Sequence, residues 1–221
     1  MGVEIELKFR LADPEPMRAL LRAAGSEYGG RFHESDRLYD TADRRLLSGD
    51  CGLRVRTRRS TGDPASVPVH TLTFKGPRGA AVPERDNPNP GRKSGAARRG
   101  ALAPASGHKV REEVETAVAA AAALDAILRS LGYQAVVAYE KRREVWQWRG
   151  CVVTIDELPR LGWWLEIEGP DVERVEHARA ALGLAAASPV RETYVELAAA
   201  HGASDAVGTR VLRFAQPQSA T

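Results

Sequence analysis

The chain has 221 residues, of which 43% are hydrophobic and 28% charged, and its formal net charge at pH 7 is +3. This length and composition are typical of one folded domain with a substantial core, and they exclude a chain that is disordered throughout. The charge is too small to indicate nucleic-acid binding by itself, so no nucleic-acid partner is expected.

Cysteine content and hydropathy predict the compartment. Cys51 and Cys151 are the only cysteines in the sequence, which is too few for a disulfide scaffold and indicates a reducing compartment. The sequence begins with a charged, alternating segment rather than a signal peptide, and no apolar run reaches the roughly 18 residues of a membrane span. We therefore expect a cytoplasmic protein with no membrane partner.

The first predicted element is a strand over residues 3–11, because apolar and charged residues alternate there with a period of two. Asp13-Pro14 then predicts the start of a helix that ends at Gly25. Further strands are predicted over 28–38, 51–58 and 69–75, with a turn at 39–43.

Residues 77–108 differ in composition from the rest of the chain. They are rich in Gly, Pro, Ala, Ser and Arg and show no apolar period. This composition predicts a disordered insertion between two strands.

The second half continues with a strand over 110–116 and a helix that stops at Gly132. Strands over 135–148 and 151–158 follow, joined by a tight turn at Arg149-Gly150, and then a strand over 163–169. One helix is predicted from Asp171 to Gly183 and a last one from Ser188-Pro189. Residues 201–221 have no periodic pattern and are predicted to form a flexible tail.

Charge recurs at alternate positions of almost every predicted strand. The nine positive and seven negative side chains are Glu4, Glu6, Lys8 and Arg10; Arg54, Arg56 and Arg58; Lys75; Arg111, Glu113 and Glu115; Lys141 and Arg143; Asp156; Glu166 and Glu168. For any single strand, a solvated face of an open sheet is the better interpretation. Mixed charge on so many strands instead favours a barrel whose charged faces line the interior and whose apolar faces lie under the helices.

A charged lumen is costly unless its charges pair or hold a ligand. Carboxylates without His or Cys suit a hard cation such as Mg²⁺ or Mn²⁺, and Arg and Lys suit phosphate oxygens. The pattern therefore predicts a site for one or two divalent ions and a polyphosphate, in which the positive excess and the ions together attract the anion.

Glu4-Ile5-Glu6-Leu7-Lys8 matches the ExExK signature of the CYTH superfamily, also called triphosphate tunnel metalloenzymes. Other segments resemble blocks of that family in the same order: Leu38-Tyr39-Asp40-Thr41 with Gly52-Leu53-Arg54-Val55-Arg56, Leu72-Thr73-Phe74-Lys75-Gly76-Pro77, Arg111-Glu112-Glu113-Val114-Glu115, Lys141-Arg142-Arg143, and Asp156 followed by Leu165-Glu166-Ile167-Glu168. The resemblance spans roughly residues 3 to 200.

The resemblance implies an α+β fold over residues 1–200: a closed eight-stranded antiparallel β-barrel, or tunnel, with a charged lumen and helices packed outside. It implies metal binding by Glu4, Glu6, Asp156, Glu166 and Glu168, whereas Glu113 either binds metal or orients a basic neighbour. Lys8, Arg54, Arg56 and Lys75 match catalytic residues that also bind substrate, and Arg111, Lys141 and Arg143 complete the substrate-binding set.

Three functions are compatible with this site. The favoured one is a metal-dependent triphosphatase that hydrolyses inorganic triphosphate, thiamine triphosphate or a nucleoside triphosphate. The second is an adenylate cyclase that forms cyclic AMP and pyrophosphate from ATP, and the third is a polyphosphate-binding module without catalysis. The expected partner is a small-molecule triphosphate, and the protein is expected to be a monomer or a homodimer.

Overall fold

The computed structural model describes residues 2–63, 65–79 and 107–215. Most of the predicted insertion, residues 80–106, lies outside the described residues, as does the end of the predicted tail, residues 216–221. Among the described helices, none is both long and apolar enough to cross a membrane.

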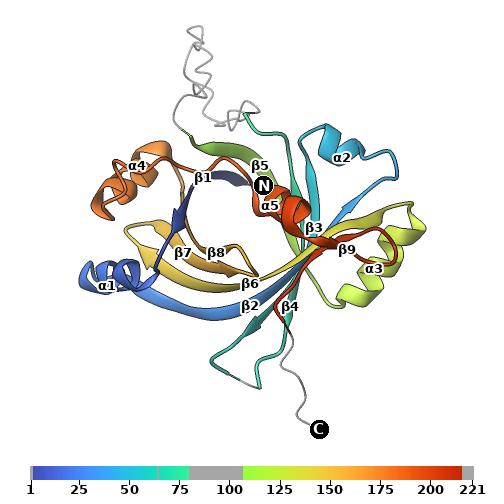
Figure 1. Ribbon diagram of the computed structural model, residues 1–221, viewed down its shortest axis with the longest axis horizontal. Helices are drawn as coiled ribbons and strands as arrows, with labels where there is room; N and C mark the ends of the chain where they lie inside the picture. Colours follow the sequence, from blue (N-terminus) through green and yellow to red (C-terminus); the bar gives the residue numbers. More distant parts are fainter. Residues whose placement is uncertain (1, 64, 80–106, 216–221) are drawn as a thin grey trace, which may run out of the picture.

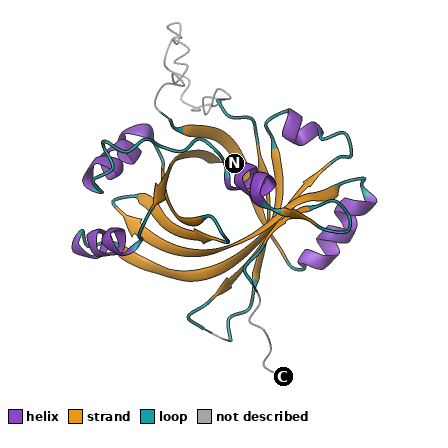
Figure 2. Cartoon of the chain, in the orientation of Figure 1, coloured by secondary structure: helices purple, strands orange, loops and turns teal. Residues whose placement is uncertain are grey.

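The centre of the molecule is a closed antiparallel β-barrel of eight strands (Figures 1 and 2). The strands are β1 (Gly2–Leu11), β2 (Glu27–Asp40), β3 (Gly52–Ser60), β4 (Val69–Lys75), β5 (Lys109–Val118), β6 (Gln134–Trp148), β7 (Cys151–Leu158) and β8 (Gly162–Gly169). They neighbour one another in the order β2-β3-β4-β5-β1-β8-β7-β6, and pairing of β6 with β2 closes the barrel. The predicted fold class is confirmed.

The alternating sequence of each strand decides which side chains face outward, because successive side chains lie on opposite faces of a strand. On β1, the side chains of Ile5, Leu7 and Phe9 face outward and are buried beneath helices α1 (Glu15–Ala23) and α4 (Val172–Ala181). Helix α3 (Ala121–Ser130) covers a smaller apolar patch on β2 and β3. The charged alternate positions are left facing the lumen.

The turn between β6 and β7 has the geometry that its sequence predicts. Arg149 and Gly150 both have positive φ angles, 48° and 80°. Two such residues form the type I′ turn, whose twist matches that of the strands it joins. This turn fixes the register that places Arg143 opposite Asp156.

The last helix, α5 (Tyr194–His201), starts later in the chain than the sequence predicts. Its N-cap is Thr193, which exchanges hydrogen bonds with Glu196 in a capping box. The preceding segment is held against β1 instead, where the Val190 amide donates to the Lys8 carbonyl at 2.7 Å. The predicted start at Ser188-Pro189 is therefore wrong, because this segment satisfies its backbone by long-range pairing.

The prediction of a flexible tail over residues 201–221 is also wrong for its first part. Strand β10 (Arg210–Leu212) pairs in parallel with β6, and β9 (Ala203–Ser204) pairs with β10. Leu212 is fully buried in a cluster with residues of β6 and α5. These strands are too short for a periodic pattern, and their stability comes from contacts with a strand about 70 residues earlier in the chain.

Helices α5 and α2 (Arg45–Ser48) lie at the same end of the barrel, near the ends of β2 and β6 that carry Leu38 and Val137 (Figure 1). Val195 and Ala199 of α5 and Leu47 of α2 line the cavity at this end. In addition to the helices packed on the outer wall, the fold therefore places one helix across an end of the tunnel.

Candidate functional site

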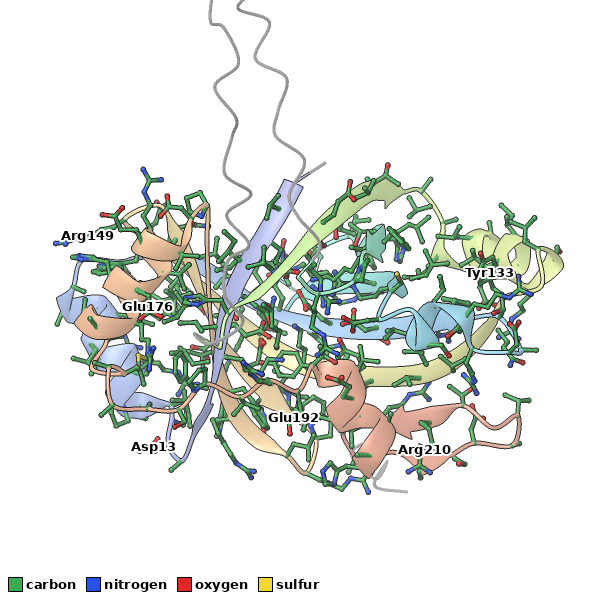
Figure 3. The ribbon with its side chains drawn as sticks, turned by 90° about the horizontal axis from the view of Figure 1, so that it is seen from above. Asp13, Tyr133, Arg149, Glu176, Glu192 and Arg210 are labelled. Carbon is green, nitrogen blue, oxygen red and sulfur yellow. The ribbon has the colours of Figure 1, made fainter. Side chains whose placement is uncertain are left out.

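The lumen of the barrel contains a cavity of about 1000 Å³, lined by side chains from seven strands, from α2 and α5 and from the loops beside them. A view from above shows many polar side chains gathered between the strands (Figure 3). The predicted site residues that line it are Glu4, Glu6, Lys8, Arg54, Arg56, Lys75, Arg111, Glu113, Lys141, Arg143, Glu166 and Glu168. Arg58 and Glu115 line it as well, whereas Arg10 is exposed outside it.

The thirteenth predicted residue, Asp156, lies behind the cavity wall. Its side chain is fully buried and accepts a fork of hydrogen bonds from Arg143, with the Nε–Oδ1 distance 2.7 Å. The Lys141 ammonium is 3.5 Å away. Asp156 is thus separated from the cavity by the cations it contacts, unlike the other acids that the sequence suggests as metal ligands.

Basic side chains from β1, β3 and β6 form one part of the lumen. Arg56 and Arg143 are held by carboxylates, and Lys8 lies 3.2 Å from Glu166. Burial lowers the pKa of Lys8 to about 8, although Glu166 and Glu6 act in the opposite direction. Its ammonium also lies 3.6 Å from the centre of the Tyr194 ring. Helix α5 therefore contributes an aromatic face to the basic part of the site.

Two acids of this region, Glu34 and Asp36 on β2, are absent from the predicted site. Both are fully buried. Asp36 accepts two hydrogen bonds from Arg56 at 2.7 Å each, and Glu34 lies 3.1 Å from Arg56 and 3.3 Å from Lys141. The sequence pattern could have identified both acids, since positions 34 and 36 are alternate charged positions of a predicted strand, like those of the other lumen residues.

The charges around Glu34 and Asp36 keep both acids ionised. Burial acts to raise the pKa of Glu34, but Arg56, Lys141 and Arg143 outweigh it and lower the pKa to about 2. Burial likewise opposes ionisation of Asp36, and Arg56 lowers its pKa well below the usual range. Carboxylates of this kind are fixed counter-charges at neutral pH rather than proton donors.

Carboxylates dominate another part of the lumen, formed by β1, β5 and β8. Burial, followed by the charge of Glu4, raises the pKa of Glu168 to about 7, and burial raises that of Glu4. Lys75 lies between two of these acids, 2.6 Å from Glu4 and 3.3 Å from Glu113. The protein thus leaves part of the negative charge of this region without a compensating cation.

The donor set of this acidic region fits a hard divalent ion. It offers carboxylate oxygens from Glu4, Glu6, Glu113 and Glu168, and no histidine lines the cavity in the described part of the chain. Burial raises the pKa of Glu4 and of Glu168, and a further positive charge beside them would favour their ionised forms. No three acids among the described residues converge as a preformed cation site, and the Lys75 ammonium lies between Glu4 and Glu113.

The charge balance of the lumen differs from the sequence-based estimate. Glu34 and Asp36 lie behind the cavity wall, Lys109, Arg78, Asp50 and Glu196 line the cavity in addition to the predicted residues, and Arg10 does not line it. The cations are Lys8, Arg54, Arg56, Arg58, Lys75, Arg78, Lys109, Arg111, Lys141 and Arg143; the carboxylates are Glu4, Glu6, Glu34, Asp36, Asp50, Glu113, Glu115, Asp156, Glu166, Glu168 and Glu196. The two sets differ by a single charge, so the expected positive excess is not found among the described residues.

One end of the cavity is bordered by polar contacts between three segments. Arg78, after β4, lies 2.8 Å from Asp50 and 3.2 Å from Glu196 of α5. Apolar side chains of α2, β6 and α5 line the same end, namely Leu47, Val137, Val195 and Ala199. The cavity therefore combines a charged lumen with one partly apolar end.

Comparison with known proteins gives the same fold. The chain is 21% identical over 204 residues to a protein of Methanocaldococcus jannaschii named as a candidate adenylate cyclase, covering 88% of this chain and 98% of that protein. A solved Pyrococcus horikoshii protein has a TM-score of 0.63 and 25% identity, covering 88% of this chain and 97% of its own. A candidate adenylyl cyclase from Hippeastrum, described as having a dominant triphosphatase activity, has a TM-score of 0.52 and 20% identity, covering 82% of this chain and 88% of its own.

The family model for the CYTH domain matches residues 2–194, which include all eight strands of the barrel and every residue of the predicted site. This match covers most of the chain and agrees with the signature at Glu4, Glu6 and Lys8. The chain belongs to the CYTH domain family.

Proposed function

We propose that this protein is a metal-dependent triphosphatase that hydrolyses the terminal phosphoanhydride of a small-molecule triphosphate inside the barrel. CYTH proteins include enzymes that act on triphosphates and generally depend on a metal ion. The observation that carries the proposal is the division of one cavity into a region rich in Arg and Lys and a region of incompletely neutralised carboxylates.

The charge balance supports metal dependence. A triphosphate brings several negative charges into a lumen in which cations and carboxylates are almost equal in number. Binding is then favourable only if further positive charge enters with the anion. Glu4, Glu6, Glu113, Glu166 and Glu168 are the residues proposed to hold Mg²⁺ or Mn²⁺, which when bound would neutralise phosphate oxygens and acidify water.

The basic residues have a direct role in the proposed reaction. Arg54 presents a planar fork that can bind phosphate oxygens in a pair, and Arg56 and Arg143 offer the N–H groups that their carboxylates leave unbound. Lys8, Lys75 and Lys141 add point charges. Since Arg56 and Arg143 are already fixed by carboxylates, their remaining N–H groups are orientated before substrate arrives. Such preorganised donors stabilise charge that develops on the transferred and leaving groups.

Adenylate cyclase activity is the second candidate, and the apolar end of the cavity favours it. Leu47, Val137, Val195 and Ala199 could contact an organic group attached to the triphosphate. In that reaction the ribose 3′-hydroxyl attacks the α-phosphorus, and pyrophosphate leaves. The same end would equally accept the organic part of a nucleoside triphosphate or thiamine triphosphate undergoing hydrolysis.

Product analysis tests these possibilities. The purified protein is incubated with inorganic triphosphate, thiamine triphosphate or ATP, each with Mg²⁺ or Mn²⁺ and with or without a chelator. Orthophosphate release that stops with chelator is expected for the triphosphatase, and cyclic AMP with pyrophosphate would identify a cyclase instead. Metal-independent binding without any product would contradict both and indicate a binding module.

A further inference from the structure

Strand β2 lies between β3 and β6, which together carry five of the ten cations of the lumen. In the register of the sheet, Glu34 is opposite Arg58 on β3 and Lys141 on β6. Asp36 is opposite Arg56 on β3 and Tyr139 on β6. The two acids are therefore placed between two rows of cations that face one cavity.

The contacts agree with this register. Glu34 lies 2.9 Å from Arg58, 3.1 Å from Arg56, 3.3 Å from Lys141 and 4.0 Å from Arg143. Asp36 accepts hydrogen bonds from the Nε and Nη2 atoms of Arg56, and Glu34 lies beside the third nitrogen, Nη1. Neither acid is accessible to solvent, and neither lines the cavity.

Two electrostatic effects follow from this arrangement. Without the acids, four cations on neighbouring strands would repel one another in a buried space. With them, the guanidinium of Arg56 is held in one orientation by a fork and a third contact. The acids thereby reduce the attraction of the lumen for any anion, but they fix the position of a donor that the reaction uses.

We propose that Glu34 and Asp36 are positioning residues that orient the phosphate-binding cations of β3 and β6 and lower their affinity for anions in the absence of metal. The inference rests on the proposed function for its effect on turnover, whereas its effect on anion affinity can be measured without turnover. If the acids had a purely structural role, replacing one would weaken both triphosphate binding and turnover as stability falls. Under the proposal, the same replacement strengthens metal-free triphosphate binding while turnover falls.

The test uses Asp36→Asn, which removes the charge and keeps the shape, and Asp36→Glu, which keeps the charge and displaces the fork. Inorganic triphosphate binding is measured by calorimetry in chelator, and kcat and KM are measured with Mn²⁺. For Asp36→Asn we expect triphosphate to bind about threefold or more tightly without metal, and kcat to fall by about 10- to 100-fold. For Asp36→Glu we expect unchanged metal-free affinity with the same loss of kcat.

Glu144→Gln is the matched control, because Glu144 on β6 is also buried and accepts a fork from Arg18 at 2.9 and 2.8 Å, but on the outer face of the barrel. We expect it to lower the melting temperature without changing kcat or triphosphate affinity. If Asp36→Asn does not fold, Glu34→Gln is measured instead, and we again expect tighter metal-free triphosphate binding and a lower kcat.

Weaker metal-free binding together with lower kcat in Asp36→Asn or Glu34→Gln would overturn the inference, as would an unchanged kcat in both. If the wild-type protein hydrolyses no triphosphate, the proposed function fails by itself. The binding measurement then still decides the electrostatic part of the inference, since tighter metal-free binding supports it and unchanged or weaker binding overturns it.

Discussion

The ammonium of Lys75 lies 2.6 Å from both carboxylate oxygens of Glu4, although β5 separates the strands that carry these residues. The contact passes over β5 on the inner wall of the barrel, in the acidic region. Lys75 thus partly neutralises the carboxylates that we propose as metal ligands, and it competes there with a divalent ion. In the proposed reaction the same ammonium would bind phosphate.

Replacing Lys75 should therefore separate metal binding from catalysis. In Lys75→Met we expect Mn²⁺ to bind about threefold or more tightly in the absence of triphosphate, because Glu4 and Glu113 lose their cation. We expect kcat/KM to fall by about 100-fold, since one phosphate donor is lost. Calorimetry with Mn²⁺ and steady-state kinetics measure the two effects.

Arg142→Met is the control for Lys75→Met. Arg142 lies on the outer face of β6, 3.0 Å from Glu157, and does not line the cavity. Neither metal affinity nor activity should change in this variant. Unchanged Mn²⁺ affinity in Lys75→Met would show that its ammonium does not compete with the ion.

Metal removal and single acid variants test the acidic region. Activity should disappear in chelator and return with added Mn²⁺, and Glu4→Ala or Glu6→Ala should abolish turnover. In Glu168→Gln we expect the Mn²⁺ concentration for half-maximal activity to rise about tenfold or more, because one carboxylate ligand becomes neutral. A metal titration of activity measures this, with Glu157→Gln on the outer face as the control. Full activity of Glu4→Ala or Glu6→Ala would contradict the metal assignment.

Stability should depend on acid pH through Glu34. The folded-state pKa of about 2 lies below the ordinary value of 4.5, so its ionisation stabilises the folded state. This stabilisation is complete above about pH 4.5 and is lost as the pH falls toward 2. It corresponds to a linkage free energy of roughly 3 kcal/mol.

Urea unfolding at several pH values between 5 and 2 tests this dependence. The free energy of unfolding of the wild type should decrease more steeply over that interval than that of Glu34→Gln, because the glutamine has no carboxylate to protonate. Equal slopes for the two proteins would show that Glu34 does not titrate in this way. Glu157→Gln, which removes a partly exposed carboxylate, should keep the steep wild-type slope.

Tyr194 should hold helix α5 over the end of the barrel. Its ring is buried, lies 3.6 Å from the Lys8 ammonium and meets Trp164 edge-on at 6.1 Å. We expect Tyr194→Ala to reduce the free energy of unfolding by about 3 kcal/mol, through lost burial and a lost cation–π contact. Tyr194→Phe keeps the ring and should retain most of that stability. A loss below about 1 kcal/mol in the alanine variant, measured by urea unfolding, would mean that α5 is held by other contacts.

Much of the barrel could be predicted because its signal is local. On β1, the alternation of Glu4, Glu6 and Lys8 with Ile5 and Leu7 decides both the strand and the face of every side chain. The turn at Arg149-Gly150 was predictable for the same reason, since two neighbouring residues determine it. Val190 and Leu212 pair through their backbones with strands that are distant in the sequence. No local sequence pattern indicates such pairing, so these two segments were not predicted.

The sequence by itself determined which residues could face the lumen, because side-chain alternation is a property of each strand alone. Only the tertiary structure decided which charges meet, since closure of the barrel brings together strands that are distant in the chain. Asp156 thereby contacts Arg143 and Lys141, and Lys75 contacts Glu4 across another strand. The same closure places Glu34 between β3 and β6, where it balances cations that the sequence alone left in excess.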